Sequence, residues 1–395
     1  MPPVTPPGYR STIAALAVGQ LIAWAALYYT FSSFVLPMQH DFGWSKPETM
    51  GAFTLGLAVW GVSSYAAGAA IDRGHGRWVM TLGAALAGAG FLLWSQVHTL
   101  TLLYLAWTLL GAAMAMTLYD PAFAVLTKRF PDHYREGITS LTLVGGFAST
   151  LSFPAVAWLV ATWGWRVALV TIGVALLFGV APLHAWALQG PDTPSRGSKH
   201  DRADDATLHE ALRHRSFWLL TVTFTLYAFV SAALWAHVMP AFAAKGTSEA
   251  QALTVVMWVG PAQVAGRVVY LWLGRFVTPR TLGLVVLAGT PLSLALFGLA
   301  DHLAGLLVFA VLFGISNGLS TIVRGNVVPE YFGREHVGRI GGAMSGIALI
   351  SRAAAPLVVA WLLLVLPGYR EVMLVLAALG VGSWLAFALA RPPQR

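Results

Sequence analysis

Ser45-Lys46-Pro47-Glu48 opens one long apolar run of this chain, and Ser248-Glu249-Ala250-Gln251 opens another 203 residues later (45 to 248). Each is a capping box, a hydroxyl side chain three residues before Glu or Gln, and such boxes mark the first turn of a helix. Gly164-Trp165-Arg166 likewise recurs as Gly368-Tyr369-Arg370, 204 residues later (166 to 370). So constant a spacing predicts two tandem copies of one fold.

The composition indicates that both copies lie in a membrane. The 395 residues are 57% hydrophobic and only 10% charged, which is too little polar surface for a soluble globule of this size. An apolar run of about 20 residues crosses roughly 30 Å of hydrocarbon as a helix. We therefore expect an all-α polytopic membrane protein with twelve transmembrane helices in two pseudo-symmetric six-helix bundles. The apolar runs are 12–38, 50–71, 78–97, 100–127, 137–160, 166–188, 216–240, 252–273, 280–300, 304–328, 339–363 and 371–390.

The net charge of +8 follows the membrane topology. With the N-terminus in the cytoplasm, 17 of the 24 Lys and Arg residues fall in cytoplasmic segments, and only Lys46, Arg166, Lys245 and Arg370 fall in outer loops. This bias is the positive-inside rule. It predicts cytoplasmic termini in a plasma membrane, with a bacterial inner membrane the expected one, and no nucleic-acid partner. Because the first apolar run is too long for a signal-peptide core, we expect no cleavable signal.

The residue content excludes several classes of catalytic site. The chain has no cysteine, which rules out disulfides, thiol catalysis and thiolate metal sites. Paired carboxylates, histidine clusters and nucleophile motifs are absent from the apolar runs. We expect neither an enzyme nor a bound cofactor, and we expect a monomer.

One polar segment divides the chain. Residues 191–215 are rich in Pro, Ser, Asp, Arg and His, and they lie where the first copy ends. We interpret them as a cytoplasmic linker between an N-terminal bundle, residues 1–190, and a C-terminal bundle, residues 216–395. The stretch from Thr207 to His214 is expected to form a short surface helix. A solvated spacer is the simpler interpretation of the linker, and a regulatory site is the alternative.

The most specific motif is Gly68-Ala-Ala-Ile-Asp72-Arg73-Gly74-His75-Gly76-Arg77, at the end of the second run. It resembles the Gly-x-x-x-Asp-Arg loop of the major facilitator superfamily, and Arg77 with Trp78-Val79-Met80 is most similar to the monocarboxylate and oxalate-formate porters. The resemblance implies the major facilitator fold and transport by alternating access. In physical terms, Gly68 permits close helix approach, Asp72 can cap a facing helix, and Arg73 and Arg77 can bind carbonyl ends. The counterpart Gly274-Arg275-Phe276 lacks the acid, so we expect an asymmetric latch.

Charged residues inside the runs suggest what is carried. These are Arg267, Arg324, Arg352 and one clear carboxylate, Asp120. Each central Arg costs about 2.5 to 3.5 kcal/mol to insert. Because one Asp cannot neutralise three arginines, we expect an anion receptor. The alternative is that Arg324 and Arg352 serve packing or gating near the cytoplasmic side, where Arg324 and Asp120, 204 residues apart (120 to 324), are expected to pair.

Arg267 is the preferred substrate ligand. It lies four residues after Gln263, so both side chains share one face of a helix. This segment resembles the eighth span of the monocarboxylate porters, where an Asp and an Arg hold these positions for proton coupling and carboxylate binding. The resemblance implies anion binding at Arg267, whereas Gln263 replaces the coupling acid and the first run lacks the Lys that this family often uses.

Two polar and aromatic stripes are expected to line a substrate cavity. The first, on the first run, has a counterpart on the seventh run 203 residues later, and the tenth run adds a third polar face. The alternative is that the aromatic residues only mark the membrane interfaces. The stripes are Gln20, Trp24, Tyr28 and Ser32; Thr223, Tyr227, Ser231 and Trp235; and Asn317, Ser320, Thr321 and Arg324.

We therefore expect a secondary transporter of a small organic anion, with a monocarboxylate as the favoured substrate. Proton symport would need a titratable group, and Asp120 and His237 are the candidates, against permanent ion pairing for Asp120 and a hydrogen-bonded wall for His237. An exporter of hydrophobic or cationic compounds is the alternative, although the fifth run, Gly145 to Pro154, lacks the Gly-Pro-x-x-Gly-Gly turn that drug antiporters share. A membrane-anchored structural or receptor protein is a further alternative.

Overall fold

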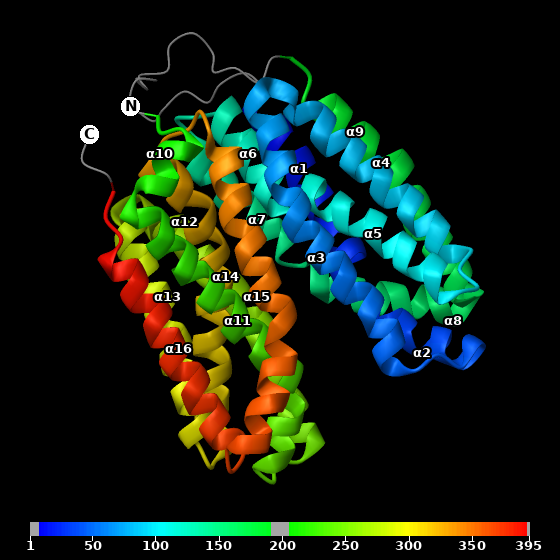
Figure 1. Cartoon of the computed structure of the whole chain (residues 1–395), viewed down its shortest axis with the longest axis vertical. Helices are drawn as coiled ribbons and strands as arrows, with labels where there is room; N and C mark the ends of the chain where they lie inside the picture. Colours follow the sequence, from blue (N-terminus) through cyan, green and yellow to red (C-terminus); the bar gives the residue numbers. More distant parts are fainter. Residues whose placement is uncertain (1–7, 191–204, 393–395) are drawn as a thin grey trace. The chain divides into compact units, whose positions relative to one another are not determined.

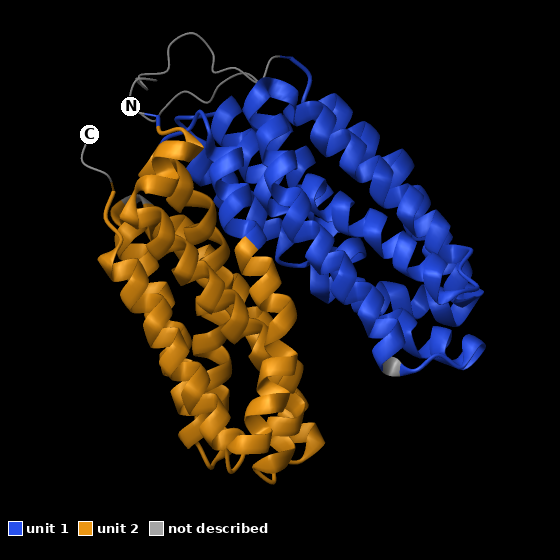
Figure 2. Cartoon of the chain, viewed as in Figure 1, with its two compact units in different colours: residues 1–205, 333–346 blue, residues 206–332, 347–395 orange. Residues whose placement is uncertain are grey.

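A computed structural model describes residues 8–190 and 205–392, and every regular element in those ranges is a helix (Figure 1). The first seven residues and most of the expected linker, 191–204, lie outside the described residues. Contact clustering divides the chain into two compact units (Figure 2). Unit 1 contains residues 1–205 and 333–346, and unit 2 contains residues 206–332 and 347–395.

Unit 1 holds the helices of the first half of the chain and the start of α15. Three of its segments, η1 to η3, are π-helical turns. The elements are α1 (Tyr9–Trp24), η1 (Ala25–Tyr29), α2 (Phe31–Phe42), α3 (Lys46–Ala70), η2 (Ile71–His75), α4 (Gly76–Ser95), α5 (Leu100–Thr117), α6 (Tyr119–Arg129), α7 (Tyr134–Gly145), α8 (Ala148–Ala175), η3 (Leu176–Val180) and α9 (Ala181–Ala187).

Unit 2 holds the helices of the second half, which run alongside one another (Figure 1). Helix α15 begins in unit 1 and continues after Gly346 in unit 2. The elements are α10 (Leu208–Arg213), α11 (Arg215–Ala244), α12 (Glu249–Leu273), the 3-10 turn η5 (Gly274–Phe276), α13 (Pro279–Leu299), α14 (Leu303–Phe332), α15 (Val337–Val365) and α16 (Tyr369–Leu389).

Ten continuous helical stretches of the described chain are long and apolar enough to cross a membrane. Two of them, Pro47–Ser95 and Tyr134–Ala187, have 49 and 54 residues, about twice what one crossing needs. Each contains a glycine with a positive φ, Gly74 at 87° and Gly164 at 78°, where the helix axis is broken. Each long stretch therefore supplies two crossings, and the ten stretches supply the expected twelve.

The expected helix starts are confirmed. Ser45 accepts a hydrogen bond from the backbone of Glu48, Ser248 does so from Gln251, and in both boxes the second side chain reaches back to the cap residue. A third box, Thr207 with Glu210, starts the short helix α10 in the described end of the linker. These caps satisfy backbone N–H groups that have no partner inside the helix.

Hydrogen bonds repeat between the units at the sequence spacing. Arg77 Nε donates to the Ala185 carbonyl at 2.9 Å, and 203 residues later Arg280 Nη2 donates to the Ala388 carbonyl at 2.6 Å. In each unit an arginine at the start of the third crossing thus binds the carbonyl end of the sixth. The negative end of a helix dipole favours such cations. The two halves therefore share contacts as well as length.

Two basic residues outside the positive-inside pattern also bind helix ends. Arg166 donates to the Ser95 carbonyl at 2.6 Å, at the end of α4. Lys245 donates to the carbonyls of Gly298 and Ala300, at 3.1 and 2.9 Å, at the end of α13. Desolvation lowers the pKa of Lys245, but the two carbonyls suit its charged form. These outer-loop cations therefore have a structural role.

Candidate functional site

The first part of the site is a polar network in unit 2, built around Arg267 on α12. Arg267 is 3% exposed, and its Nε donates to the Gly318 carbonyl on α14 at 3.0 Å. Helices α12 and α14 lie very close here, because a Cβ at Gly318 would be 2.7 Å from the Gln263 carbonyl oxygen. Arg267 Nη2 lies 3.5 Å from Thr321 Oγ1. A backbone carbonyl therefore fixes the guanidinium plane without neutralising its charge.

A second set of contacts joins α11 to α14. The Tyr227 hydroxyl donates to Asn317 Oδ1 at 2.8 Å and lies 2.7 Å from Ser320 Oγ. Arg267 and Arg352 both act electrostatically on this hydroxyl. The fold thus brings the expected ligands of three helices into one polar network. Ser231, one turn after Tyr227, is buried on the same helix.

The electrostatics of this network favour a negative ligand. The acidic residues of the described part of unit 2 all lie in loops or within the first or last turn of a helix, whereas Arg267, Arg324 and Arg352 lie inside long helices. Charge inside hydrocarbon is costly unless a partner compensates it. The acids are Glu210, Glu249, Asp301, Glu330 and Glu371.

The aromatic stripe of unit 1 is less regular than an α-helix would make it. Gln20 is fully buried, and its Nε2 donates to the Thr117 carbonyl at 2.5 Å. Trp24 has ring centroids 4.8 Å from Tyr119 and 5.4 Å from Tyr28. The expected four-residue stripe is wrong beyond this point, because the π-helical turn Ala25–Tyr29 inserts a residue and leaves Ser32 exposed.

The matching stripe of unit 2 also splits. Thr223 is fully buried and donates to the Leu219 carbonyl of its own helix at 2.8 Å, while Trp235 is 43% exposed. His237 has two polar partners, with Nδ1 3.2 Å from the Tyr369 hydroxyl and Nε2 3.1 Å from the Pro356 carbonyl. Because a carbonyl can only accept, Nε2 carries the proton and Nδ1 accepts from the tyrosine. His237 is therefore a hydrogen-bonded neutral residue in this state.

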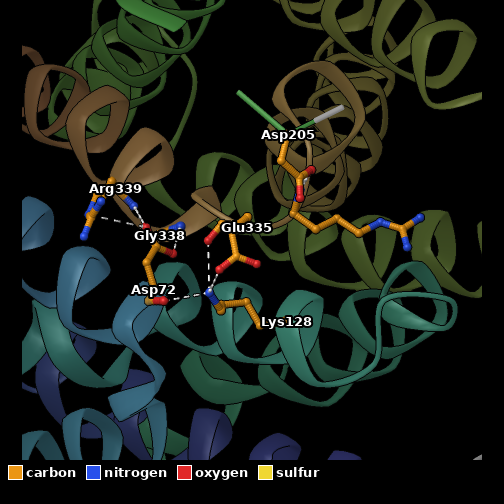
Figure 3. Close-up of polar contacts among 7 residues, drawn as sticks. Asp72, Lys128, Asp205, Glu335, Gly338 and Arg339 are labelled. Atoms are coloured by element: carbon orange, nitrogen blue, oxygen red, sulfur yellow. Dashed lines mark hydrogen bonds and ion pairs between the residues drawn. The ribbon is translucent and has the colours of Figure 1, made fainter. Parts of the chain in front are cut away.

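A third cluster, in unit 1, gathers around Asp72 (Figure 3). Asp72 is 9% exposed and accepts hydrogen bonds from the backbone N–H groups of Gly338 at 2.9 Å and Arg339 at 2.8 Å. These N–H groups belong to the first turn of the 29-residue helix α15. A carboxylate at a helix N-terminus is favoured by its free donors and by the helix dipole. Asp72 thus caps α15.

Lys128, on α6, completes this cluster. Its Nζ donates to the Asp72 carbonyl at 2.8 Å and to the Glu335 carbonyl at 3.0 Å, and lies 3.7 Å from Glu335 Oε1 (Figure 3). The side chain is only 8% exposed. Asp205, at the described end of the linker, accepts from the Arg334 backbone N–H at 2.8 Å. Three separate segments of unit 1 therefore hold residues 334–339 in place.

Glycines allow α15 to lie against α3. A Cβ at Gly338 would overlap the Gly68 carbonyl, one at Gly342 would lie 2.5 Å from the Ser64 carbonyl, and one at Gly346 would lie 2.9 Å from the Gly61 carbonyl. Small residues at four-residue spacing permit such close packing of membrane helices. The start of α15 is thus docked on α3 over three turns.

The remaining expected gating residues have other surroundings. Arg73 is exposed, and Arg77 binds the end of α9. Asp120 is the second residue of α6 and Arg324 lies on α14, so the two belong to different units, and their pairing stays a prediction.

Sequence reasoning missed Lys128 and the glycine repeat. Lys128 was only one of several cytoplasmic basic residues, and nothing local distinguished it. The spacing of Gly338, Gly342 and Gly346 was visible in the sequence and is the signal that would have identified the docked helix.

Comparison with known proteins places this geometry in a family. A sequence model of the Major Facilitator Superfamily matches residues 16–304. Monocarboxylate transporter 13 of Rattus norvegicus is 31% identical over 289 residues, which are 71% of this chain and 65% of that protein. The oxalate:formate antiporter of Oxalobacter formigenes is 26% identical over 237 residues, 59% of this chain and 56% of that protein. The chain thus matches just under two thirds of the length of the rat relative.

Solved structures show the same fold at low identity. The human organic anion transporter MFSD10 (TETRAN) has a TM-score of 0.74 and 14% identity, covering 97% of this chain and 100% of that one. The E. coli fucose:proton symporter FucP has a TM-score of 0.76 and 12% identity, covering 98% and 100%. With twelve crossings, paired helix-end contacts and the docked Asp72 loop, these likenesses lead to one assignment: the chain is a multi-pass membrane protein that belongs to the Major Facilitator Superfamily.

Proposed function

We propose that this protein is a secondary transporter that moves a small organic anion, a monocarboxylate, across the membrane by alternating access. The observation that carries the proposal is Arg267, buried within a helix of unit 2 and oriented by the Gly318 carbonyl. A guanidinium held in this way can bind a carboxylate through two parallel hydrogen bonds. The names of the matched relatives, transporters of monocarboxylates and of oxalate and formate, agree with an anionic substrate.

The polar network supplies the neutral part of the site. Thr321, Asn317 and Tyr227 offer hydroxyl and amide groups beside the guanidinium. Gln263 lies one turn before Arg267 on α12 and cannot titrate. We therefore expect anion binding to persist at neutral and mildly alkaline pH, and any proton coupling to require another group, for which Asp120 and His237 are the candidates.

The experiment is uptake of labelled lactate into proteoliposomes, with binding measured by calorimetry. Arg267→Ala should abolish saturable uptake, and Arg267→Lys should weaken binding by roughly a hundredfold, the value of losing one or two charge-assisted hydrogen bonds. Arg280→Lys is the matched control, because Arg280 binds backbone carbonyls at the end of α16. This variant should keep its anion affinity.

Unchanged affinity in Arg267→Ala would refute the anion site. Export of a hydrophobic or cationic compound would then be the better hypothesis, and inhibition of the purified protein by such compounds would support it.

The membrane placement belongs to the same proposal. The distribution of basic residues supports a bacterial inner membrane with both termini in the cytoplasm and a monomeric transporter. Reporter fusions after residues 44 and 75 should report opposite sides of the membrane, and equal reporter signals would contradict this topology.

A further inference from the structure

Three polar atoms of unit 1 lie buried without a hydrogen-bond partner among the described residues. They are Gln20 Oε1, Trp24 Nε1 and Trp60 Nε1. Gln20 and Trp60 are 0% and 4% exposed. The orientation of the Gln20 amide is fixed, because its Nε2 donates to the Thr117 carbonyl, which can only accept. A buried polar group without a partner costs about 1 to 3 kcal/mol, so three in one place need an explanation.

The backbone is irregular on both sides of these atoms. The π-helical turn Ala25–Tyr29 follows Trp24, and α5 ends at Thr117 before α6 starts at Tyr119. Side chains satisfy the carbonyls at these breaks, since Ser152 Oγ donates to the Ala25 carbonyl at 2.8 Å, as Gln20 does to Thr117. Interrupted helices in membrane transporters surround binding sites. The breaks are compensated, whereas the three side-chain atoms are not.

Aromatic rings gather around the same point. The Trp24 ring has centroids 4.8 Å from Tyr119, 5.4 Å from Tyr28 and 6.1 Å from Trp60. Such rings favour a flat apolar group, which can stack or meet them edge-on.

The polarity of the three atoms selects the ligand. Two indole N–H groups need acceptors, and one amide oxygen needs a donor. A cation such as an ammonium group offers no acceptor to an indole, and a carboxylate offers no donor to the amide oxygen. A hydroxyl has one donor and two acceptor lone pairs, which is the complementary set.

We propose that Gln20, Trp24 and Trp60 form an uncharged subsite that binds a hydroxylated aromatic ring of the transported acid. This inference rests on the proposed organic-anion transport and narrows its substrate class to monocarboxylates with a hydroxyphenyl tail. The subsite lies within unit 1, and its contribution is separate from that of Arg267 in unit 2.

Another indole provides a matched control. Trp107 is also fully buried and its Nε1 has no hydrogen-bond partner among the described residues. Its ring, however, is enclosed edge-on by Phe31, Phe53 and Trp94, at interplanar angles of 82°, 72° and 73°. Trp107→Phe removes the same N–H group from an aromatic core that has no adjacent helix break.

The test compares two acids that differ by one hydroxyl, 4-hydroxyphenylacetate and phenylacetate, as inhibitors of lactate uptake by the full-length protein in proteoliposomes. The wild type should bind the hydroxylated acid more tightly. Trp24→Phe and Trp60→Phe keep the ring and should lower this preference by roughly three- to tenfold, the value of one net hydrogen bond. Trp107→Phe should leave the preference unchanged.

Two results would overturn the subsite while leaving anion transport intact. One is lactate uptake with equal inhibition by the two acids in the wild type, which would mean that the unpaired atoms hold only water. The other is an equal loss of preference in Trp107→Phe, which would indicate a packing effect. Absence of any saturable organic-anion uptake would instead refute the proposed function, and calorimetry with neutral 4-methylphenol would then decide the subsite alone, since binding lost in Trp60→Phe needs no carboxylate.

Discussion

Removing the Asp72 carboxylate should release the start of α15 from unit 1. In Asp72→Ala, the backbone N–H groups of Gly338 and Arg339 lose acceptors at 2.9 and 2.8 Å. Hydrogen bonds to a charged group are worth about 1.5 to 3 kcal/mol each, so the two together stabilise the docked helix by about 3 to 6 kcal/mol. Every 1.4 kcal/mol is a factor of ten in an equilibrium constant. Local opening of residues 333–346 should therefore increase at least about a hundredfold.

Hydrogen exchange followed by mass spectrometry measures this opening directly. Peptides that cover residues 333–346 should lose protection in Asp72→Ala, and lose less in Asp72→Asn, which keeps one acceptor oxygen. Asp132→Asn is the control, because Asp132 is a more exposed acid of the same cluster, 3.5 Å from Arg334. Equal protection in Asp72→Ala and the wild type would refute the capping argument. Loss of protection throughout unit 1 would show that the variant is globally destabilised, in which case Asp72→Asn decides the question.

Three further predictions concern packing, pairing and coupling. Gly342→Leu places its side chain against the Ser64 carbonyl, which a Cβ alone would approach to 2.5 Å, and should lower the melting temperature and raise exchange in the same peptides; an unchanged melting temperature and exchange would contradict this. The double variant Asp120→Arg with Arg324→Asp should recover part of the uptake that either single change loses, and a double variant no better than the worse single one would rule out the pairing. Gln263→Asp should make lactate uptake more strongly pH dependent or block it through an internal ion pair; a pH profile identical to the wild type would contradict this.

The parts of the fold that follow a local code were predictable. Capping boxes at Ser45 and Ser248 depend on four adjacent residues, and membrane crossings depend on length and apolarity. The repeat was visible because Arg77 and Arg280 each serve the same helix-end contact. Such features need no knowledge of which helices are neighbours.

The site was less predictable because it depends on departures from regular helices. The π-helical turn after Trp24 follows no sequence signal that we can identify, and it shifts every later side chain of that crossing. Lys128 acquires its role only because Glu335, more than 200 residues away, presents a carbonyl and a carboxylate to it. Contacts of that range are set by tertiary packing. Arg267 was identifiable because a charge inside an apolar run is itself the signal.

The anchoring of Arg267 bears on how transport would be coupled to an ion. Where an Asp stands one turn before the Arg, a proton on the Asp would control whether the guanidinium is neutralised. Here that position is Gln263, and the Gly318 carbonyl orients the Arg instead, so its charge stays available at every physiological pH. His237 is held neutral between the Tyr369 hydroxyl and the Pro356 carbonyl. Protonation of His237 would have to break its bond to Tyr369, because Nδ1 would become a donor. We therefore expect substrate binding itself to be insensitive to pH between about 6 and 8, and any pH dependence to appear in the rate of exchange between conformations.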